Sequence, residues 1–368
     1  MSADSCGACL RRAWLLEALA PYIERVATGK PGSRAPELLR LPDERLAAAV
    51  AGKSAERILA AVHELSEREL RGRLEAADCW AVCRHDRRYP QALRGLADAP
   101  AALLGTGQSA PLERLEMDRT VTVVGARRAG AYGVEVARSL GRGLAAAGFT
   151  VVSGMALGVD GAAHRGALEA GETLAVLGCG PDVAYPALHR GLHRQIRNRT
   201  AVIAELPPGS GPWRWMFPAR NRIMAGLGAM TVVVVAAEQS GSLITADIAS
   251  ELGREVGAVP GPVNSVQSEG ANKLLADGAH LVRDAQDVLD ALLGPGVRTL
   301  RATGPPLDPD LLPLLDAIEG ELTDHDSIAL ELGRDGASVA AALARLELLG
   351  YVRGSLSGRY ARTGLERP

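Results

Sequence analysis

Three hydroxyl side chains surround a glycine in the stretch with the clearest binding chemistry. Ser240, Ser242 and Thr245 flank Gly241, directly after the apolar run at 231–237. That run is β-branched and does not alternate, which indicates a strand buried on both faces of a parallel sheet. A helix that begins after such a strand has unpaired backbone N–H groups in its first turn. The stretch therefore predicts an anion site, and phosphate is the expected anion.

Arginines from two other segments are expected at the same site. Arg220 and Arg222 belong to a polar cluster that starts at Phe217 and is interpreted as the turn before the apolar run. Arg127 follows an earlier predicted strand at 121–124. Because ligands of open α/β sheets bind at the carboxyl ends of the strands, these turns should converge.

The number of arginines favours a polyanion over a single small phosphate. Residues 183–222 contain seven arginines and one acidic residue, Glu205. A single small phosphate needs only about two of these cations, whereas single-stranded nucleic acid runs along a basic groove and stacks its bases on aromatic rings. Phe217, Trp213 and Trp215 lie beside the arginines and are candidates for stacking. The alternative for these rings is a hydrophobic plug beneath a loop.

Nucleotide-binding motifs are missing from the first βα turn. The G-x-G-x-x-G spacing is absent around Gly125, and the second predicted strand ends in Ser153-Gly154, where an NAD enzyme places an acidic residue. The G-x-x-x-x-G-K-[ST] run is also absent. Both observations argue against a dinucleotide enzyme and a P-loop nucleotidase.

Other polar residues permit catalytic or metal-binding interpretations that the sequence supports weakly. Asp160 and His164 share a helix face, but Asp160 is more simply the N-cap of that helix and no third ligand is apparent. Cys179 lacks an identifiable base. Lys273, at the start of a predicted helix, can reach a backbone phosphate or remain a solvated surface lysine. No catalytic residue, metal or cofactor is therefore assigned.

The five cysteines are interpreted as unpaired thiols. Their odd number in a chain without a secretory pattern argues against a disulfide framework. Cys6 and Cys9 could join Cys79 and Cys83 in a four-thiolate zinc site, but the pairs are far apart in sequence and lack the glycine turns of zinc knuckles.

Composition indicates a globular, cytoplasmic protein of more than one domain. The 368 residues are 47% hydrophobic and 23% charged, with a net charge of −2, so affinity for nucleic acid must come from a local site. The first thirty residues contain acidic side chains and no continuous apolar segment, and the valine run is too short to span a bilayer.

Strand and helix patterns predict a doubly wound, mostly parallel sheet between two smaller modules. Helical periodicity covers the first part of the chain, and two extra strands are expected at 79–83 and 101–105. Regular alternation follows, with strands at 121–124, 150–152, 174–177, 201–204, 232–235, 255–259 and 280–282 and helices at 132–147, 159–169, 186–198, 243–253, 267–276 and 285–293. The predicted domains are a helical module at 1–75, an α/β core at 76–294, a linker at 295–306 and a terminal domain at 307–368.

The terminal domain has the pattern of a winged helix. Helices are expected at 309–319, 325–333 and 337–349, followed by a hairpin between 351 and 360. Residues 307–335 include nine acidic side chains and a single basic one, Arg334. Such a surface repels phosphate, which favours a protein contact or an inert cap over DNA binding.

Six motifs of the core resemble the DprA/Smf family of DNA-processing proteins. They are G-A-R…Y-G at 125–133, S-G-M-A-L-G-V-D…H at 153–164, A-V-L-G-C-G…Y-P at 175–186, F-P-A-R-N-R-I-M-A-G-L at 217–227, S-G-S-L-I-T-A at 240–246 and V-P-G at 259–261. The likeness is strong from about 78 to 293. It is weaker for the flanking modules, which resemble the family's SAM-like and winged-helix domains.

The resemblance implies an extended Rossmann-like fold that binds single-stranded DNA, protects it and loads the recombinase RecA during natural transformation. It also implies a homodimer through that fold and no catalytic turnover. Ala126 departs from the family, which usually has serine there, whereas Arg127 is retained as a principal phosphate ligand. The candidate nucleic-acid contacts are Gly125, Arg127, Ser153, Gly154, Phe217, Arg220, Asn221, Arg222, Ser240, Gly241, Ser242, Thr245 and Lys273.

A second function class is an enzyme resembling the cytokinin-activating phosphoribohydrolases. Those enzymes carry a P-G-G-x-G-T-x-x-E run, in which a catalytic glutamate follows the phosphate loop. Here the corresponding stretch places Glu238 before the loop. The order of these groups argues against hydrolysis.

Overall fold

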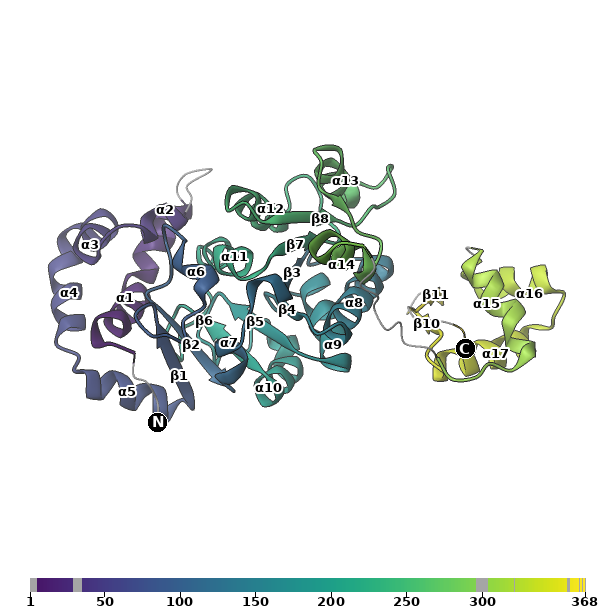
Figure 1. The fold of residues 1–368 in the computed structure, drawn as a ribbon, viewed down its shortest axis with the longest axis horizontal. Helices are drawn as coiled ribbons and strands as arrows, with labels where there is room; N and C mark the ends of the chain where they lie inside the picture. The colour runs from purple at the N-terminus through teal and green to yellow at the C-terminus, as the bar shows by residue number, and fades with distance from the viewer. Residues whose placement is uncertain are drawn as a thin grey trace.

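A nine-stranded sheet forms the centre of the protein, in the order β1-β2-β6-β5-β4-β3-β7-β8-β9 (Figure 1). The computed structural model describes residues 5–28, 35–295, 304–320, 322–355, 358–363, 365 and 367. β2 runs antiparallel to its neighbours β1 and β6, and the other pairs are parallel. The strands are β1 (Cys79–Cys83), β2 (Ala102–Gly107), β3 (Thr120–Val124), β4 (Thr150–Ser153), β5 (Thr173–Leu177), β6 (Ala201–Ala204), β7 (Met230–Val233), β8 (Glu255–Ala258) and β9 (His280–Leu281).

Helices cover both faces of the sheet because its strands are apolar on both sides. In β3, Val121 and Val123 pack toward one layer of helices and Val124 toward the other. The first layer contains α8 (Ala131–Ala146), α9 (Val159–Ala170), α10 (Arg190–Arg199) and α14 (Ala285–Leu293). The second contains α6 (Gln91–Arg94), α11 (Met216–Leu227), α12 (Gly241–Glu251) and α13 (Glu269–Ala276). The predicted α/β architecture and the two extra strands are confirmed.

Helix α11 corrects the prediction of a turn before the valine strand. Arg220 and Arg222 lie within this helix, and both are buried. Pro218 is tolerated because it stands in the first turn, where its missing N–H is not needed. Since nearly every residue of the helix from Ala219 onward is buried, no polar face reveals its period in the sequence.

The N-terminal helices share a hydrophobic core with the edge of the sheet. Leu19 of α1 and Leu104 of β2 belong to one buried cluster, which also contains Trp215. The backbone N–H of Trp215 donates to Glu24 of α1 at 3.1 Å. Trp215 is 2% exposed, and Trp213 packs against the same cluster, so the plug interpretation holds for Trp215. The helices are α1 (Gly7–Thr28), α2 (Ala35–Leu39), α3 (Asp43–Ala51), α4 (Ala55–His63) and α5 (Glu67–Ala76).

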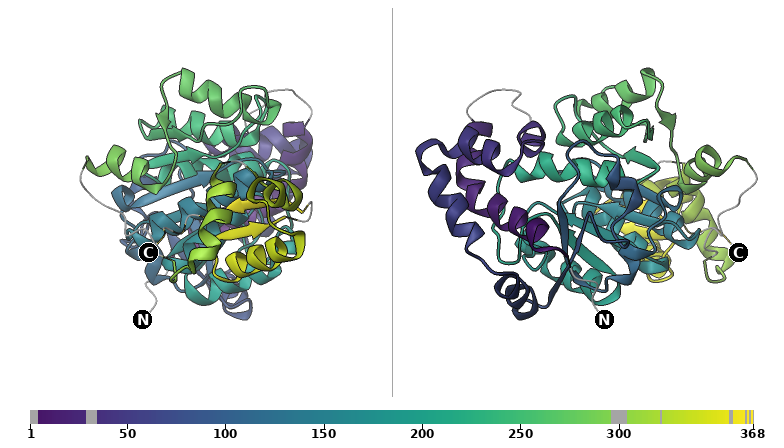
Figure 2. Two further views of the ribbon diagram at one scale, coloured as in Figure 1. Left: turned by 90° about the vertical axis from the view of Figure 1, so that its right-hand side faces the viewer. Right: turned by 60° about the vertical axis from the view of Figure 1, so that its left-hand side comes forward.

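The C-terminal helices have a separate core at the opposite end of the molecule (Figures 1 and 2). They are α15 (Leu312–Glu319), α16 (His325–Leu332) and α17 (Gly336–Leu348), followed by the hairpin β10 (Val352–Gly354) and β11 (Tyr360–Arg362). Most of the predicted linker, 296–303, and the hairpin residues 356 and 357 lie outside the described residues. Within the described chain, no helix combines the length and apolarity that a membrane crossing requires.

Candidate nucleic-acid interface

A cavity of about 490 Å³ opens where β3 ends, between α11 and the start of α12. The strand order reverses at this point, because β3 lies between β4 and β7, and open α/β sheets bind ligands at such a switch. Nine of the thirteen predicted contacts line the cavity, namely Gly125, Arg127, Phe217, Arg220, Asn221, Ser240, Gly241, Ser242 and Thr245. The structure therefore brings together the segments that the sequence predicted to converge.

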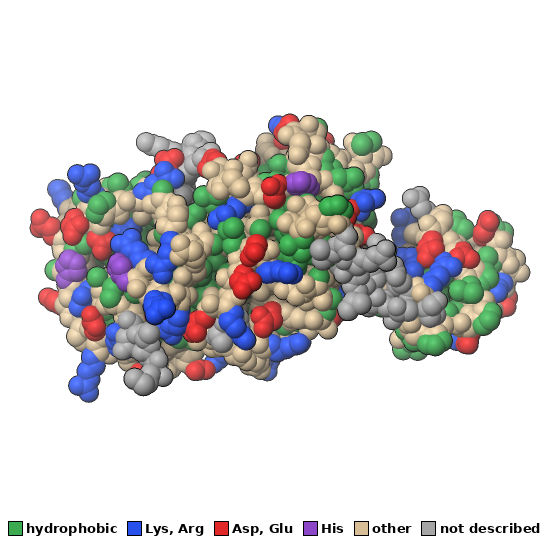
Figure 3. Space-filling model, in the orientation of Figure 1, with side chains coloured by type: hydrophobic (Ala, Val, Ile, Leu, Met, Phe, Trp, Pro, Cys, Tyr) green, Lys and Arg blue, Asp and Glu red, His purple; other side chains and the backbone are tan. Residues whose placement is uncertain are grey.

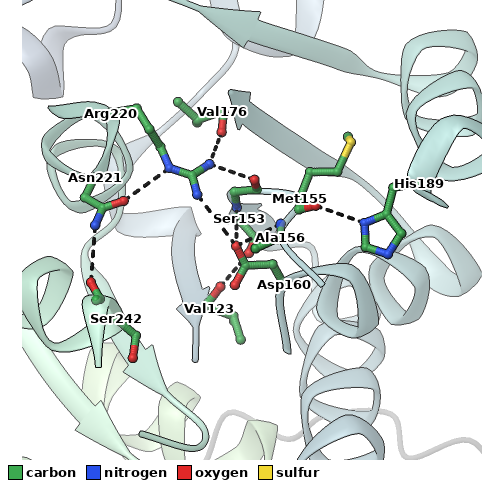
Figure 4. A network of polar contacts seen from close by, with 12 residues as sticks. Val123, Ser153, Met155, Ala156, Asp160, Val176, His189, Arg220, Asn221 and Ser242 are labelled. Carbon is green, nitrogen blue, oxygen red and sulfur yellow. Dashed lines mark hydrogen bonds and ion pairs between the residues drawn. The ribbon is translucent and has the colours of Figure 1, made fainter. Parts of the chain in front are cut away.

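Arg220 lies on the floor of the cavity and hydrogen-bonds to three surrounding residues (Figure 4). Its Nη1 donates to the carbonyl of Gly154 at 2.7 Å and to that of Val176, and its Nε donates to Asn221 Oδ1 at 3.1 Å. Nη2 lies 3.9 Å from Asp160 Oδ2. Burial lowers the pKa of Arg220, while Asp160 opposes that shift. The guanidinium is thus anchored by the ends of β4 and β5.

Asp160 has a structural role, but the prediction of an N-cap is wrong, because Gly158 is the N-cap of α9 and no side chain of the described residues caps this helix. Asp160 instead holds the turn after β4. Its Oδ2 accepts backbone N–H groups from Gly154 at 3.2 Å and Ala156 at 3.3 Å. Burial raises the pKa of Asp160, against the opposing effect of Arg220. His164 is bound to Thr173 Oγ1 at 2.6 Å, and burial lowers its pKa to about 3. Among the described residues, Asp160 and His164 thus have different hydrogen-bond partners.

Gly154 makes room for the buried guanidinium. A Cβ at this position would overlap the guanidinium of Arg220. Gly154 thus has a packing role beside the cavity, and its contact with a ligand stays a prediction. Ser153 is likewise fully buried, and its hydroxyl donates to the carbonyl of Val123 at 2.7 Å. Both residues support the floor from below.

Gly154→Ala is expected to lower the free energy of unfolding by about 1–3 kcal/mol, because the added methyl must displace a buried side chain that three hydrogen bonds hold. Gly191→Ala on α10 is the matched control, since its Cβ would meet no atom within 4 Å. Urea denaturation of both variants measures the difference. Equal stability of Gly154→Ala and the wild type would show that Arg220 is not held as described.

Arg127 and Phe217 form the exposed wall of the cavity. The Arg127 guanidinium lies 5.2 Å from the centre of the Phe217 ring, in cation–π contact. The Phe217 ring also contacts Tyr185, with centroids 5.5 Å apart and planes tilted by 34°. Arg127 is exposed and has no salt bridge within the described chain. Its charge is available to a ligand, unlike that of Arg220.

The start of α12 supplies the hydroxyl side of the cavity. Ser240 caps the helix by accepting the N–H of Ser242, and the two hydroxyls lie 2.7 Å apart. Thr245 is buried and its hydroxyl has no partner within the described residues. Asn221 reaches this helix through a 3.4 Å contact with the carbonyl of Gly241. The predicted helix start after the valine strand is confirmed, two residues earlier than expected.

Arg222 does not reach the cavity, which corrects its prediction as a phosphate contact. It is 2% exposed, and its Nη2 binds both carboxylate oxygens of Glu205 at 2.8 and 2.9 Å. Its Nε lies 3.2 Å from Asp98 Oδ2. Burial alone would lower the pKa of Arg222, but the carboxylates of Glu205 and Asp98 raise it by more. The net shift of the pKa is therefore upward. The side chain is committed to this ion-pair cluster.

Lys273 lies outside the cavity, on α13 near the first residues of α12. It is exposed, and its Nζ is 3.8 Å from Glu238 Oε1. An adjoining hollow is lined by Lys273, Glu238 and Ser240. The nearby carboxylate weakens the attraction of this lysine for phosphate.

Two further residues that the sequence did not single out line the cavity. Arg214 is exposed at its rim, and Tyr185 completes the aromatic pair with Phe217. Arg214 stands between two tryptophans, which is the signal that could have identified it.

Cys179 is buried and donates to the carbonyl of Val183 at 3.4 Å, and burial raises its pKa to about 12. A nucleophilic role for Cys179 is not supported.

Charge within the cavity is net positive, although the wider surface is mixed. Arg127, Arg214 and Arg220 contribute three cations, against Asp160 as the acidic lining residue. On the face in Figure 3, acidic and basic side chains are interspersed over the sheet and its helices. The cavity is therefore a local concentration of positive charge on a chain whose net charge is small.

Comparison with known proteins places the central part of the chain in a family. The family model of DNA recombination-mediator protein A matches residues 80–293. The chain is 48% identical over 173 residues to a putative DNA processing protein DprA of Mycobacterium tuberculosis, a match that covers 47% of this chain and 44% of that protein. This chain thus spans less than half the length of that relative. It is 36% identical over 284 residues to protein Smf of Escherichia coli, covering 74% and 75%.

Solved structures agree with this assignment. DNA processing protein A from Streptococcus pneumoniae superposes with a TM-score of 0.61 at 31% identity, covering 77% of this chain and 95% of that one. A structure of DNA processing protein A from Helicobacter pylori, which concerns its single-stranded DNA binding mode, superposes with a TM-score of 0.52 at 28% identity, covering 58% and 95%. The chain belongs to the DNA recombination-mediator protein A family, together with the DNA-processing proteins DprA and Smf.

Proposed function

We propose that this protein binds single-stranded DNA in the cavity at the carboxyl end of β3. The observation that carries the proposal is the combination of an exposed arginine, Arg127, which has no salt bridge among the described residues, with the aromatic pair of Phe217 and Tyr185. Single-strand binders combine backbone cations with rings on which bases stack. The Helicobacter pylori relative is described in terms of its single-stranded DNA binding mode, which supports the same ligand here.

The cavity suggests how a strand is held. Arg127 and Arg214 contact phosphates at the rim, and the start of α12 offers hydroxyl donors to another phosphate. A base stacks on the aromatic pair of Phe217 and Tyr185, of which Tyr185 is 38% exposed. Arg220 stays on the floor and acts by positioning Asn221 and the turn at Gly154.

In the cell, this binding protects single strands and loads RecA during recombination or natural transformation. The protein acts in the cytoplasm, without catalytic turnover, as a homodimer through the α/β core. We assign the domains as a SAM-like helical module at 1–75, an extended Rossmann-like core at 76–294, a linker at 295–306 and a winged helix at 307–368. The three helices and hairpin of the last domain support the winged-helix assignment.

The position of Glu238 disfavours a phosphoribohydrolase. Glu238 is exposed, pairs with Lys273 and does not line the cavity. A general acid or base must come within hydrogen-bond reach of the reacting atoms. A mononucleotide bound in the cavity would not meet this carboxylate.

Fluorescence polarisation with a labelled homopolymeric single strand, a duplex of equal length and competing AMP tests the proposed function. The single strand is expected to bind more tightly than the duplex, because stacking on Phe217 requires unpaired bases, and AMP is expected not to compete. Release of adenine from AMP that is lost in Glu238→Gln would establish the enzyme instead. Equal affinity for duplex and single strand would contradict the stacking mode.

A further inference from the structure

We propose that Cys6, Cys9, Cys83 and His85 bind a structural zinc ion that fastens the N-terminal helices to the first strand of the sheet. One ligand atom from each of these residues lies within 4.8 Å of the other three. The site is independent of the DNA-binding cavity, whose lining includes none of the four residues. It also differs from the set that the sequence suggested, since His85 takes the place of Cys79.

The distances fit tetrahedral coordination. Nδ1 of His85 lies 3.4 Å from the Cys6 sulfur and 3.5 Å from the Cys9 sulfur. With Zn–S bonds of about 2.3 Å and Zn–N bonds of about 2.0 Å, tetrahedral angles separate sulfur from nitrogen by about 3.5 Å. The structure thus already spaces His85 Nδ1 and these two sulfurs as zinc requires, whereas a disulfide requires sulfurs about 2 Å apart. All five cysteines are free thiols.

Strand geometry explains why Cys79 is excluded. Cys79 and Cys83 stand at opposite ends of β1, and four residues of extended chain span about 13 Å. The Cys79 sulfur instead donates to the carbonyl of Ala77 at 3.4 Å. His85 follows Cys83 by two residues, just past the end of the strand, so the second ligand pair is C-x-H.

The first ligand pair is held in place by contacts with α5. Cys6 precedes α1 and Cys9 lies in its first turn, which gives the C-x-x-C spacing common in structural zinc sites. The N–H of Gly7, between them, donates to Glu67 Oε1 at 3.0 Å, and a Cβ on Gly7 would overlap that side chain. Arg71 donates to the carbonyl of Ser5 at 2.9 Å. These contacts orient the cysteine pair before a metal binds.

The ligand chemistry selects zinc among the cellular metals. Three thiolates and one imidazole form a set suited to tetrahedral Zn²⁺, and four protein ligands leave no open position for substrate. Cys9 and Cys83 are each 3% exposed, so the site is shielded on the protein side. The ion therefore has a structural role, joining residues about 75 positions apart in the chain.

Zinc analysis of the full-length protein tests the proposal. The protein is purified under reducing conditions without chelators or a metal-affinity step, and inductively coupled plasma mass spectrometry is expected to find one zinc ion per chain. Cys83→Ser and His85→Ala should each lower the zinc content by tenfold or more. Cys79→Ser, on the same strand, and Cys179→Ser are matched controls that should retain it. Markedly substoichiometric zinc, a different stoichiometric metal, or full retention in Cys83→Ser would overturn the proposal.

A spectroscopic readout separates metal ligation from simple misfolding of the variants. Co²⁺ in place of zinc in the wild type should give the visible absorption of a tetrahedral site and sulfur-to-metal charge transfer. His85 is exposed, so His85→Ala should fold and lose the tetrahedral spectrum. Chelation of the zinc should lower the melting temperature, since the ion binds only the folded chain, and leave single-strand affinity unchanged. An octahedral cobalt spectrum in the wild type would contradict the ligand set.

Discussion

Arg222→Ala is expected to lower the free energy of unfolding by about 3–5 kcal/mol, because it leaves two buried carboxylates without their cation. Glu205 and Asp98 are 4% and 9% exposed and both contact this guanidinium. The cluster joins α11 to the end of β6 and to the segment before β2. The melting temperature should fall by roughly 6–20 °C, measured by circular dichroism.

Arg194→Ala is the matched control for this stability loss. Arg194 is an exposed arginine on α10, and removing it should change the free energy of unfolding by less than about 0.5 kcal/mol. If Arg222→Ala has the same melting temperature as the wild type, the ion-pair cluster contributes no net stability. Weaker DNA binding by Arg222→Ala at unchanged stability would return Arg222 to the set of phosphate contacts.

Arg127→Ala is expected to weaken single-strand binding by about ten- to a hundredfold. A charge-assisted contact with phosphate contributes about 1.5–3 kcal/mol, and each 1.4 kcal/mol is roughly a factor of ten. The side chain is exposed and lies over the Phe217 ring, so the melting temperature should stay nearly constant. Filter binding and thermal melts on the same preparation measure both quantities.

Arg128→Ala is the internal control for this loss of affinity. Arg128 is the exposed neighbour of Arg127 but does not line the cavity, so its removal should have little effect. If both variants bind alike, the contribution of Arg127 is general electrostatic attraction and not a specific contact. If Arg127→Ala melts early, its loss of binding reports on folding.

The sheet was predictable because its strands carry two strong local signals. Continuous β-branched runs, such as the one at 231–237, indicate strands buried on both faces, and glycines mark the turns between them. The bounds of β6 and α14 agree with the prediction to the residue. The convergence of distant turns also followed from sequence, since parallel strands end at the same edge.

Helix α11 was not predictable from such local signals. Its two arginines, which were predicted to be exposed in a turn, are buried in the helix. A fully buried helix has no amphipathic period, and its polar residues looked like an exposed turn. Arg220 was expected to behave like Arg127, exposed and available to phosphate. Because its donors are used by main-chain carbonyls, Arg220→Ala should destabilise the fold as well as the cavity.

The cluster of Cys6, Cys9, Cys83 and His85 was anticipated only in part, because the sequence grouped Cys6 and Cys9 with Cys79 and Cys83 and argued against that site. Cysteine spacing alone cannot reveal that a histidine beyond a strand end completes the set. The pairing depends on how α1 packs against β1, a long-range contact that no local pattern encodes.

Polarisation titrations at a series of salt concentrations measure how many DNA phosphates the protein contacts. Each phosphate contacted adds about −0.7 to the slope of log K against log salt for single-stranded DNA. The wild type and Arg128→Ala should share one steep slope, and Arg127→Ala should be shallower by about one phosphate contact. A salt-independent affinity, or equal slopes for Arg127→Ala and the wild type, would contradict phosphate binding at the carboxyl end of β3.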